Sequence, residues 1–348
     1  MKILITGNMG YVGPGLLEQL RRTTPEAVLV GIDTGYFAHC LTGVSIFPEA
    51  RLDVQHFSDL RTLPEGLFDG VDAVVHLAAI SNDPMGDRFK EVTHDINFEA
   101  SLDVAKKAKA AGVSSFVFAS SCSVYGFAEG EARNEQAPLN PLTAYAKSKI
   151  GMEGELNKLA SDDFVVTCLR FATACGASDR LRLDLVLNDF VAGAVASKQI
   201  TVLSDGTPWR PLIHVNDMAL AIDWALQRSA DHGGAFLALN SGSNEWNYQV
   251  RDLAEAVAEV IPGVEVSINK DAPEDKRSYQ VDFGLYKKLA PDHQPQMTLK
   301  SSIEDLAERL EFMNFNDGDF RNSQLIRLKV LGQHLEHGRL NNQLEWQK

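Results

Sequence analysis

The chain has 348 residues, 45% of them hydrophobic, so it is long enough to bury a core in each of two lobes. Its formal net charge of −14 argues against a nucleic-acid surface and means that an anionic ligand needs a local group of arginines. Its four cysteines lack metal-ligand spacing, and the sequence shows neither a cleavable signal nor an apolar run of membrane length. We therefore expect a cytoplasmic protein with no bound metal and no membrane partner.

A glycine-rich turn follows the first predicted strand. Residues 2–6 form an apolar run, Gly7, Gly10 and Gly13 come next, and an amphipathic segment with three leucines follows. In a dinucleotide-binding unit the first glycine allows the tight turn, the second lets the backbone approach a diphosphate, and the third lets helix and strand pack closely. The order of strand, glycine turn and helix predicts a dinucleotide site at the start of the first helix.

An acidic residue closes the second predicted strand. Residues 28–32 are apolar, and Asp33 follows them at the place where a carboxylate binds the ribose hydroxyls of a dinucleotide, about 20 residues beyond the glycine turn. No arginine stands in the next several positions. Because a carboxylate would repel a 2′-phosphate, Asp33 predicts NAD rather than NADP as the cofactor.

Strands and helices continue to alternate through the first half of the chain. Apolar runs at residues 73–77, 115–119 and 164–170 predict buried parallel strands, and residues 90–111 and 145–160 predict helices. This order predicts an α/β fold with a doubly wound, Rossmann-like parallel sheet whose ligands bind beyond the carboxyl ends of the strands. His76 lies inside an apolar run, so we expect a hydrogen-bonded core residue there.

The composition changes after residue 173, where helices mix with short strands and many turn residues. We expect residues 1–173 to form the NAD-binding domain, with residues 206–230 returning to it. Residues 174–205 and 231–348 are expected to form a smaller, mixed α/β substrate lobe. Leucines at helical spacing in the tail, residues 321–348, favour a helix packed on the body, with a partner-binding helix as the alternative.

A tyrosine and a lysine stand four residues apart in the helix predicted after residue 144. Tyr145 and Lys149 would share one face, with roughly 5–6 Å between their Cβ atoms. A phenol is a weak base near neutral pH, and a close ammonium favours its phenolate. Ser121, at the end of a predicted strand, would supply a hydroxyl to the same reacting oxygen. The spacing alone also fits an ordinary surface helix, so its weight comes from the dinucleotide site upstream.

With these pieces the chain resembles the extended short-chain dehydrogenase/reductases that act on nucleotide sugars, the NAD-dependent epimerase/dehydratase family, and especially the UDP-glucose and UDP-galactose 4-epimerases. The resemblance covers nearly all of residues 1–290 and rests on residues 6–13 and 76–79, Asn97, Ser121 four before Tyr125, and Tyr145 with Lys149.

The resemblance assigns roles to these residues. It implies that Tyr145 is the base and acid, that Lys149 binds the ribose and lowers the pKa of the tyrosine, and that Ser121 holds the reacting oxygen. It places Asp53 and Val54 against the adenine. The cofactor-binding residues that it implies are Gly7, Gly10, Tyr11, Val12, Gly13, Asp33, Asp53, Val54, Leu77, Ala78, Ala79, Asn97, Tyr145 and Lys149.

The second half also resembles the family. Arg210 and Arg277 match arginines that grip the diphosphate of the sugar nucleotide, and Asn188 matches an asparagine that donates to it. An arginine fork suits phosphate oxygens better than a lysine does. Arg180 and Arg182 are either further phosphate contacts or a solvated helix start. We expect the sugar to be recognised near Ser81, Ser121 and Thr173.

Departures from the family pattern narrow the predicted chemistry. Cys122 and Ser123 stand where 4,6-dehydratases carry an acid and a base, so dehydration is disfavoured, and Cys122 is expected to be a packed thiol. The sequence predicts a nucleotide-sugar epimerase that works through a transient ketone. The alternatives are an NAD-dependent sugar-nucleotide dehydrogenase or 4-ketoreductase and a non-catalytic NAD-binding protein. The resemblance also implies a homodimer through the helices at residues 90–111 and 145–160.

Overall fold

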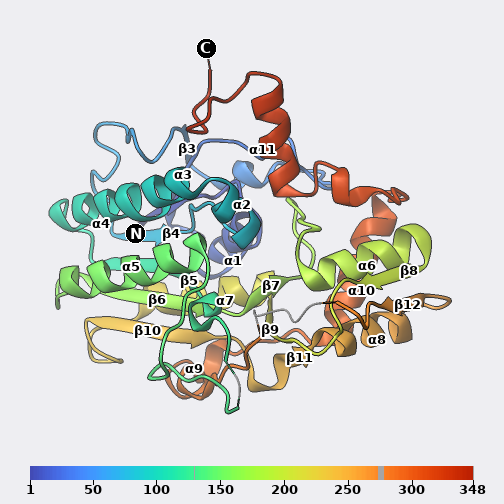
Figure 1. Cartoon of the computed structure of the whole chain (residues 1–348). Helices are drawn as coiled ribbons and strands as arrows, with labels where there is room; N and C mark the ends of the chain where they lie inside the picture. The colour runs from blue at the N-terminus through green and yellow to red at the C-terminus, as the bar shows by residue number, and fades with distance from the viewer. Residues whose placement is uncertain (129, 273–277, 348) are drawn as a thin grey trace.

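A seven-stranded parallel sheet forms the centre of the larger lobe (Figure 1). The computed structural model describes residues 1–128, 130–272 and 278–347. The strands lie in the order β10-β6-β5-β4-β1-β2-β3, and each neighbouring pair is parallel. In chain order they are β1 (Lys2–Thr6), β2 (Val28–Asp33), β3 (Val54–Phe57), β4 (Ala73–His76), β5 (Ser115–Ser121), β6 (Val165–Phe171) and β10 (Phe236–Ser241).

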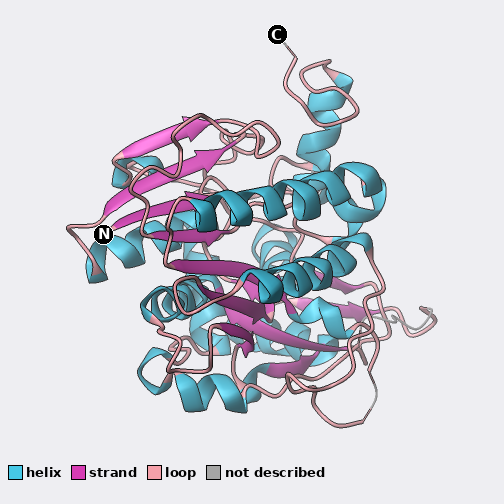
Figure 2. Cartoon of the chain, turned by 90° about the vertical axis from the view of Figure 1, so that its left-hand side faces the viewer, coloured by secondary structure: helices cyan, strands magenta, loops and turns pink. Residues whose placement is uncertain are grey.

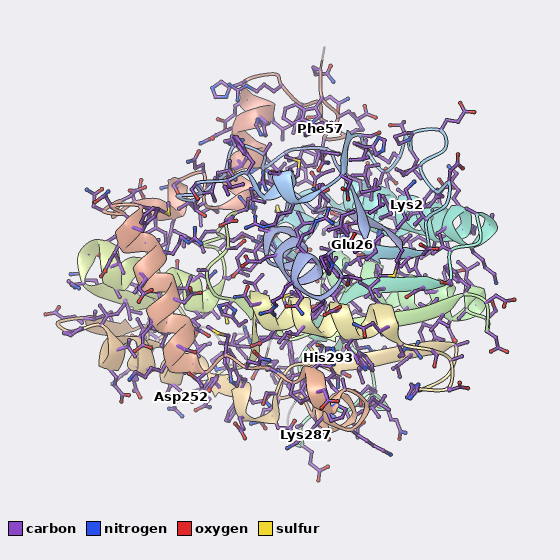
Figure 3. All side chains as sticks on the ribbon, turned by 180° about the vertical axis from the view of Figure 1, so that it is seen from behind. Lys2, Glu26, Phe57, Asp252, Lys287 and His293 are labelled. Carbon is purple, nitrogen blue, oxygen red and sulfur yellow. The ribbon has the colours of Figure 1, made fainter. Side chains whose placement is uncertain are left out.

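Helices cover both faces of this sheet because side chains alternate along each strand (Figure 2). In β1, Ile3 and Ile5 join one buried cluster, and Leu4 joins the other. Helices α1 (Gly13–Thr23) and α7 (Val215–Gln227) lie together across the first face, as the view from behind shows (Figure 3). Helices α4 (Ser101–Ala110) and α5 (Ala144–Leu159) pack on the second. The doubly wound α/β fold is therefore confirmed.

The predicted helix over residues 90–111 is present but irregular. A short helix, α2 (Asp83–Arg88), precedes α3 (Lys90–His94), and a π-helical stretch, Asp95–Ala100, joins α3 to α4. Such π-helical turns often occur at functional sites. Here the wider turn contains Asn97, which is buried.

The smaller lobe has its own core. A three-stranded sheet contains β7 (Thr173–Cys175), β9 (Trp209–His214) and β11 (Asn247–Gln249), and β8 (Gln199–Val202) pairs with β12 (Glu265–Ile268). Three helices, α6 (Val186–Ser197), α8 (Val250–Val260) and α10 (Leu299–Phe312), pack through Leu187, Leu253 and Leu306. A further helix, α9 (Gly284–Leu289), lies beside β10.

The expected domain boundaries need three corrections. Strand β10 lies in the stretch assigned to the substrate lobe, but it joins the main sheet beside β6, because α7 carries the chain back across that sheet. Within residues 206–230, α7 does return, whereas β9 pairs in the small sheet. The tail packs on the larger lobe through α11 (Arg327–Glu336), where Leu331 and Leu344 are buried with Tyr36.

The tail therefore follows the preferred interpretation of a helix packed on the body. Among the described residues, no helix is long and apolar enough to cross a membrane.

Candidate active site

A large cavity, of about 740 Å³, lies at the carboxyl edge of the main sheet. Residues that follow or end six of its strands line the cavity, as expected for a doubly wound sheet. The smaller lobe supplies the opposite wall through residues such as Thr173, Asp184 and Arg210. The residues from the larger lobe at these strand ends are Gly7, Asp33, Ser58, Leu77, Ser121 and Phe171.

The glycine turn forms a cradle at the start of α1. Gly7 has a φ of 74°, and a Cβ there would lie 2.6 Å from the backbone nitrogen of Ala78. A Cβ at Gly13 would lie 1.8 Å from the carbonyl oxygen of Asn8, so this glycine allows helix and strand to pack closely, although it does not itself line the cavity. No side chain caps the N-terminus of α1. The turn can therefore offer free backbone N–H groups to a diphosphate.

Asp33 is held in place by backbone donors. One carboxylate oxygen accepts from the N–H of Met9 at 3.1 Å and the other accepts from the N–H of Gly35 at 2.7 Å. Burial raises the pKa of the Asp33 carboxyl above its ordinary value, an effect that these hydrogen bonds oppose. Asp33 lines the cavity at the end of β2, so its remaining acceptor capacity faces a bound ligand.

Asp53 and Val54 are not at the cavity, which corrects their predicted place against the adenine. They stand at the beginning of β3, where Asp53 pairs with Arg21 at 2.8 Å and accepts from the N–H of Leu29. The hydrogen bond from Arg21 lowers the pKa of the Asp53 carboxyl. Strand β3 ends at Phe57, and its carboxyl end brings other residues to the cavity, namely Ser58, Asp59 and Leu60.

The loop after β4 forms the next part of the wall. Leu77, Ala78 and Ala79 line the cavity. Asn97 lies behind them, where its side-chain oxygen accepts from the N–H of Ile80 at 2.8 Å and its amide donates to the Ile80 carbonyl at 3.0 Å. Asn97 therefore fixes the loop that a cofactor would contact, and the structure does not place its side chain on the cavity surface.

His76 is a core residue, as expected. Its ring nitrogens lie 2.9 Å from the hydroxyls of Thr6 and Ser101, and its ring stacks between Phe116 and Phe118. Burial lowers its pKa to about 3, with a smaller contribution from the Lys149 charge.

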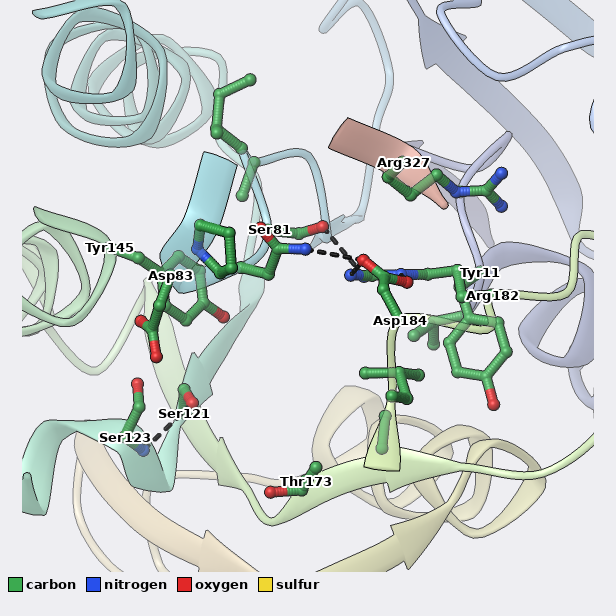
Figure 4. Close-up of a pocket in the computed structure, with 18 of the residues that line it drawn as sticks. Tyr11, Ser81, Asp83, Ser121, Ser123, Tyr145, Thr173, Arg182, Asp184 and Arg327 are labelled. Carbon is green, nitrogen blue, oxygen red and sulfur yellow. Dashed lines mark hydrogen bonds and ion pairs between the residues drawn. The ribbon is translucent and has the colours of Figure 1, made fainter. Parts of the chain in front are cut away.

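The three predicted catalytic side chains all line the cavity, and Figure 4 shows Ser121 and Tyr145 on the same side of it. Ser121 ends β5, and Tyr145 and Lys149 come from the first turns of α5, whose N-terminus is capped by Thr143. An interaction with the Ser121 hydroxyl lowers the pKa of the Tyr145 phenol. Lys149 Nζ lies 5.4 Å from the centre of the Tyr145 ring and donates to the Ala119 carbonyl at 2.6 Å.

The pKa values of this group differ from the simple expectation. Burial raises the pKa of Tyr145 to about 12, the Asp83 carboxylate adds to the increase, and the hydrogen bond with Ser121 opposes it. Burial lowers the pKa of Lys149 to about 8. In this structure Tyr145 is therefore a neutral phenol, and additional positive charge is required before it can act as a base.

Asp83 is a cavity residue that the sequence analysis missed. It is the first residue of α2, which Asn82 caps, and it accepts a 2.6 Å hydrogen bond from the Thr143 hydroxyl. Figure 4 shows its carboxylate on the same side of the cavity as Tyr145. The available signal was a helix-capping segment, residues 82–84, directly after a strand end at the ligand-binding edge of the sheet.

Ser81, Thr173 and Arg210 line the cavity, so these candidates for substrate binding are brought together. Ser81 accepts from Arg182 at 3.1 Å, and Arg182 is also held by both oxygens of Asp184. Arg182 is thus a cavity residue and not part of a solvated helix start. Arg277 lies outside the described residues.

Asn188 and Arg180 lie elsewhere, which corrects their candidate roles. The amide of Asn188 donates to the Tyr11 hydroxyl and to the Arg182 carbonyl, and its oxygen accepts from the N–H of Gly176. Because both donor groups are used, Asn188 positions its neighbours and does not contact the cavity. Arg180 forms a buried ion pair with Glu49 at 2.6 Å and also does not line the cavity.

Comparison with known proteins identifies the family. A family model described as "NAD dependent epimerase/dehydratase family" matches residues 3–238. The chain belongs to this family. It is 29% identical over 231 residues to the uncharacterized UDP-glucose epimerase YtcB of Bacillus subtilis, an alignment that covers 64% of this chain and 71% of the relative. It is 25% identical over 317 residues to UDP-glucuronic acid decarboxylase 6 of Arabidopsis thaliana, covering 88% of each.

A solved structure agrees with the fold. The UDP-glucose-4-epimerase from Stenotrophomonas maltophila, with bound NAD and formylated UDP-arabinopyranose, has a TM-score of 0.77 and 23% identity, and the match covers 90% of this chain and 99% of that one. At this identity the likeness shows the fold alone.

Membership of the epimerase/dehydratase family confirms the sequence resemblance and the dependence on NAD. The residues present fit this cofactor. The cradle at Gly7 excludes any side chain, the N-terminus of α1 is uncapped, and Asp33 is fixed at the end of β2. Members of the family differ in their reactions, since the relatives include an epimerase and a decarboxylase, so membership establishes the enzyme class and not the reaction.

Proposed function

We propose that the protein is an NAD-dependent nucleotide-sugar epimerase that works through a transient keto sugar. The observation that carries the proposal is that Ser121, Tyr145 and Lys149 line the same cavity as the glycine cradle, with Lys149 Nζ 5.4 Å from the centre of the Tyr145 ring. Relatives named as UDP-glucose epimerases support it.

The roles of the three side chains follow from their positions. Tyr145 takes the proton of the sugar hydroxyl and later returns one, Ser121 donates a hydrogen bond to the reacting oxygen, and Lys149 stabilises the phenolate by its charge. When bound, NAD would supply the hydride acceptor and donor for the sugar carbon, and its oxidised ring would add positive charge to the site. The protein otherwise orients the sugar and excludes water from the ketone.

Arg210 is the proposed contact for the diphosphate of the substrate. It comes from β9 on the wall opposite the catalytic residues, and it lines the cavity. Ser81 and Thr173 are proposed to contact the sugar, since both lie on this surface.

The residues after Ser121 support epimerisation over dehydration. Cys122 is buried and its thiol donates to the Arg170 carbonyl at 3.1 Å, and burial raises its pKa, so it is a neutral packed group. Ser123 offers only a hydroxyl. A dehydratase is nevertheless the second candidate, because Asp83 places one carboxylate beside Tyr145.

The test is to incubate the purified protein and NAD with UDP-, dTDP-, GDP- and ADP-linked sugars in deuterated water and to follow the products by NMR. Epimerisation by hydride return predicts an inverted sugar without deuterium at the inverted carbon. Elimination would instead give a deoxy-keto sugar with deuterium from the solvent. Stoichiometric NADH with an unconverted keto sugar would reject the epimerase and favour a dehydrogenase or ketoreductase.

A Tyr145→Phe variant supplies the matched control. It is expected to bind NAD as the wild type does and to lose turnover. Equal turnover in the two proteins would reject Tyr145 as the base and favour a binding protein. The homodimer expected through α4 and α5 stays a prediction, which light scattering can check. The cytoplasmic location also stays a prediction.

A further inference from the structure

The C-terminal segment, residues 325–346, crosses from one lobe to the other above the cofactor end of the cavity. It begins in the core of the smaller lobe, where Leu325 is buried and its carbonyl accepts from the N–H of Leu183 at 3.0 Å. It ends on the larger lobe, where Leu340 and Leu344 are buried with Tyr36. Between these anchors, the first residues of α11 line the cavity, namely Ile326, Arg327 and Leu328.

The segment holds the loop that follows Asp33. The indole of Trp346 donates to the Thr34 carbonyl at 2.7 Å, and a ring nitrogen of His334 lies 2.9 Å from the Tyr36 carbonyl. The Tyr36 hydroxyl donates to the Leu344 carbonyl. Thr34 and Tyr36 both line the cavity. The tail and the wall beside Asp33 are therefore one connected unit.

Arg327 is a buried cation that forms no ion pair with the described residues, although the Asp184 carboxylate, paired with Arg182, lies near enough for its charge to act on it. Arg327 is 1% exposed, and its guanidinium stacks over the Phe37 ring at 4.7 Å. One nitrogen, Nη2, donates to the Arg180 carbonyl at 2.8 Å, whereas Nη1 has no hydrogen-bond partner among the described residues. The nearby Cys40 thiol is neutral because burial raises its pKa. A buried guanidinium in this state is costly unless a ligand supplies the acceptor.

Its two arginine neighbours differ from it because each forms an ion pair with a carboxylate. Arg182 is paired with Asp184 and Arg180 with Glu49, so two of the three guanidinium charges are compensated within the protein. Burial lowers the pKa of Arg327 to about 10, which leaves it cationic at neutral pH. The N-terminus of α11, which begins at Arg327, has no side-chain cap. The cavity wall therefore carries at this place a positive charge that no ion pair within the described residues neutralises.

We propose that residues 325–346 form a strap that closes over the bound dinucleotide, and that Arg327 donates to the diphosphate bridge of NAD. The sugar nucleotide also carries a diphosphate, but Arg327 packs against Phe37 in the loop after Asp33, and it lies at the Tyr11 end of the cavity in Figure 4, away from Tyr145. The consequence is slow release of NAD between turnovers. The choice of NAD as the ligand of Arg327 rests on the proposed function, but it does not depend on which sugar is converted.

The test measures binding by calorimetry with the full-length protein freed of nucleotide. For Arg327→Gln we expect the affinity for NAD and for ADP-ribose to fall about 10- to 100-fold, as for loss of a charge-assisted hydrogen bond, with the affinity for adenosine unchanged. Arg327→Lys should recover part of the loss. Arg339→Gln, at an exposed position of the same segment, is the matched control and should bind as the wild type does.

Ligand choice separates the possible outcomes. A loss confined to UDP or UDP-glucose would overturn the assignment by placing Arg327 on the substrate, and unchanged affinities for every ligand would overturn it as well. If the wild type binds no NAD, the proposed function itself fails.

The strap has an independent measurement. Amide hydrogen exchange in residues 327–346 of the wild type should slow at least severalfold on saturation with NAD, and unchanged exchange would reject closure even if Arg327→Gln failed to fold. Trp346→Ala, outside the cavity, should speed NAD release severalfold, and an unaltered release rate would also reject the strap.

Discussion

Lys149 Nζ lies 5.4 Å from the centre of the Tyr145 ring, and at the start of α5 Lys149 is buried while Tyr145 is half-buried. The ammonium is held by the Ala119 carbonyl and lies 4.6 Å from the centre of the Phe118 ring, so it cannot move away from the phenol without losing these contacts. The pKa of Lys149, lowered by burial to about 8, remains above neutral. The charge needed to favour the phenolate is therefore fixed in place.

Lys149→Met should reduce kcat/KM at pH 7 by about 10²- to 10⁴-fold, the usual contribution of acid–base catalysis. Without the ammonium the pKa of Tyr145 rises further, so the acid limb of the pH profile of kcat/KM should shift to higher pH. Lys147→Met, an exposed lysine of the same helix, is the control. A uniform decrease with no change in the profile would contradict the electrostatic role.

Asp83→Asn should shift the acid limb of the pH profile of kcat/KM to lower pH, opposite to the effect of Lys149→Met. The Asp83 carboxylate raises the pKa of Tyr145, so its removal lowers that pKa, and the base becomes available at lower pH. The shift should appear in the pH profile of kcat/KM even if the amide weakens sugar binding at every pH. Asp87→Asn, exposed on the same helix, should leave the profile unchanged. A limb that stays in place would show that Asp83 does not act on Tyr145.

The parts of this site that could be predicted are those that short sequence segments specify. The glycine cradle, Asp33 and the pair Tyr145 and Lys149 each lie within one strand, turn or helix. Asp83 was missed because its approach to Tyr145 depends on α2 packing against α5. A Cβ at Gly86 would lie 3.3 Å from the Tyr145 backbone, and no local pattern reveals such a contact.

The errors have similar causes. Asp53 was chosen because β3 is a half-exposed edge strand without an apolar run, so its end could not be located from hydrophobicity. Arg180 and Arg182 are two residues apart in sequence, but Glu49 binds the first and Ser81 accepts from the second, and both partners are distant in the chain. The seventh strand, β10, was missed because its partner β6 lies about 70 residues earlier.

Gly7→Ala should abolish NAD binding. The added methyl group would lie 2.6 Å from the backbone of Ala78, in a residue whose φ of 74° already disfavours any side chain. Backbone atoms cannot move aside as a flexible side chain can, so the cradle must distort. Gly70→Ala is a useful comparison, because Gly70 also has a positive φ, of 64°, but has open space around it. Calorimetric titration with NAD would show retained affinity in Gly7→Ala if the cradle were unimportant.

His76 should make the stability of the protein depend on pH. Its pKa is about 3 in the native state because of burial, and about 6.5 in the unfolded chain, so between these values the unfolded state binds a proton that the native state does not. The contribution of the neutral His76 to the free energy of unfolding is fully present above about pH 6.5 and is lost progressively as the pH falls toward 3. At pH 5 the loss amounts to about 2 kcal/mol.

The measurement is the free energy of unfolding in urea, at pH 8 and pH 5, for the wild type and His76→Asn. The variant loses the ring contacts with Phe116 and Phe118, so it should be less stable at pH 8. Because the asparagine of the variant cannot take up a proton, the difference between the two free energies of unfolding should be about 2 kcal/mol smaller at pH 5 than at pH 8. His337→Asn, at an exposed position, should show no such narrowing. A gap of equal size at both pH values would mean that the buried imidazole does not remain neutral in the native state.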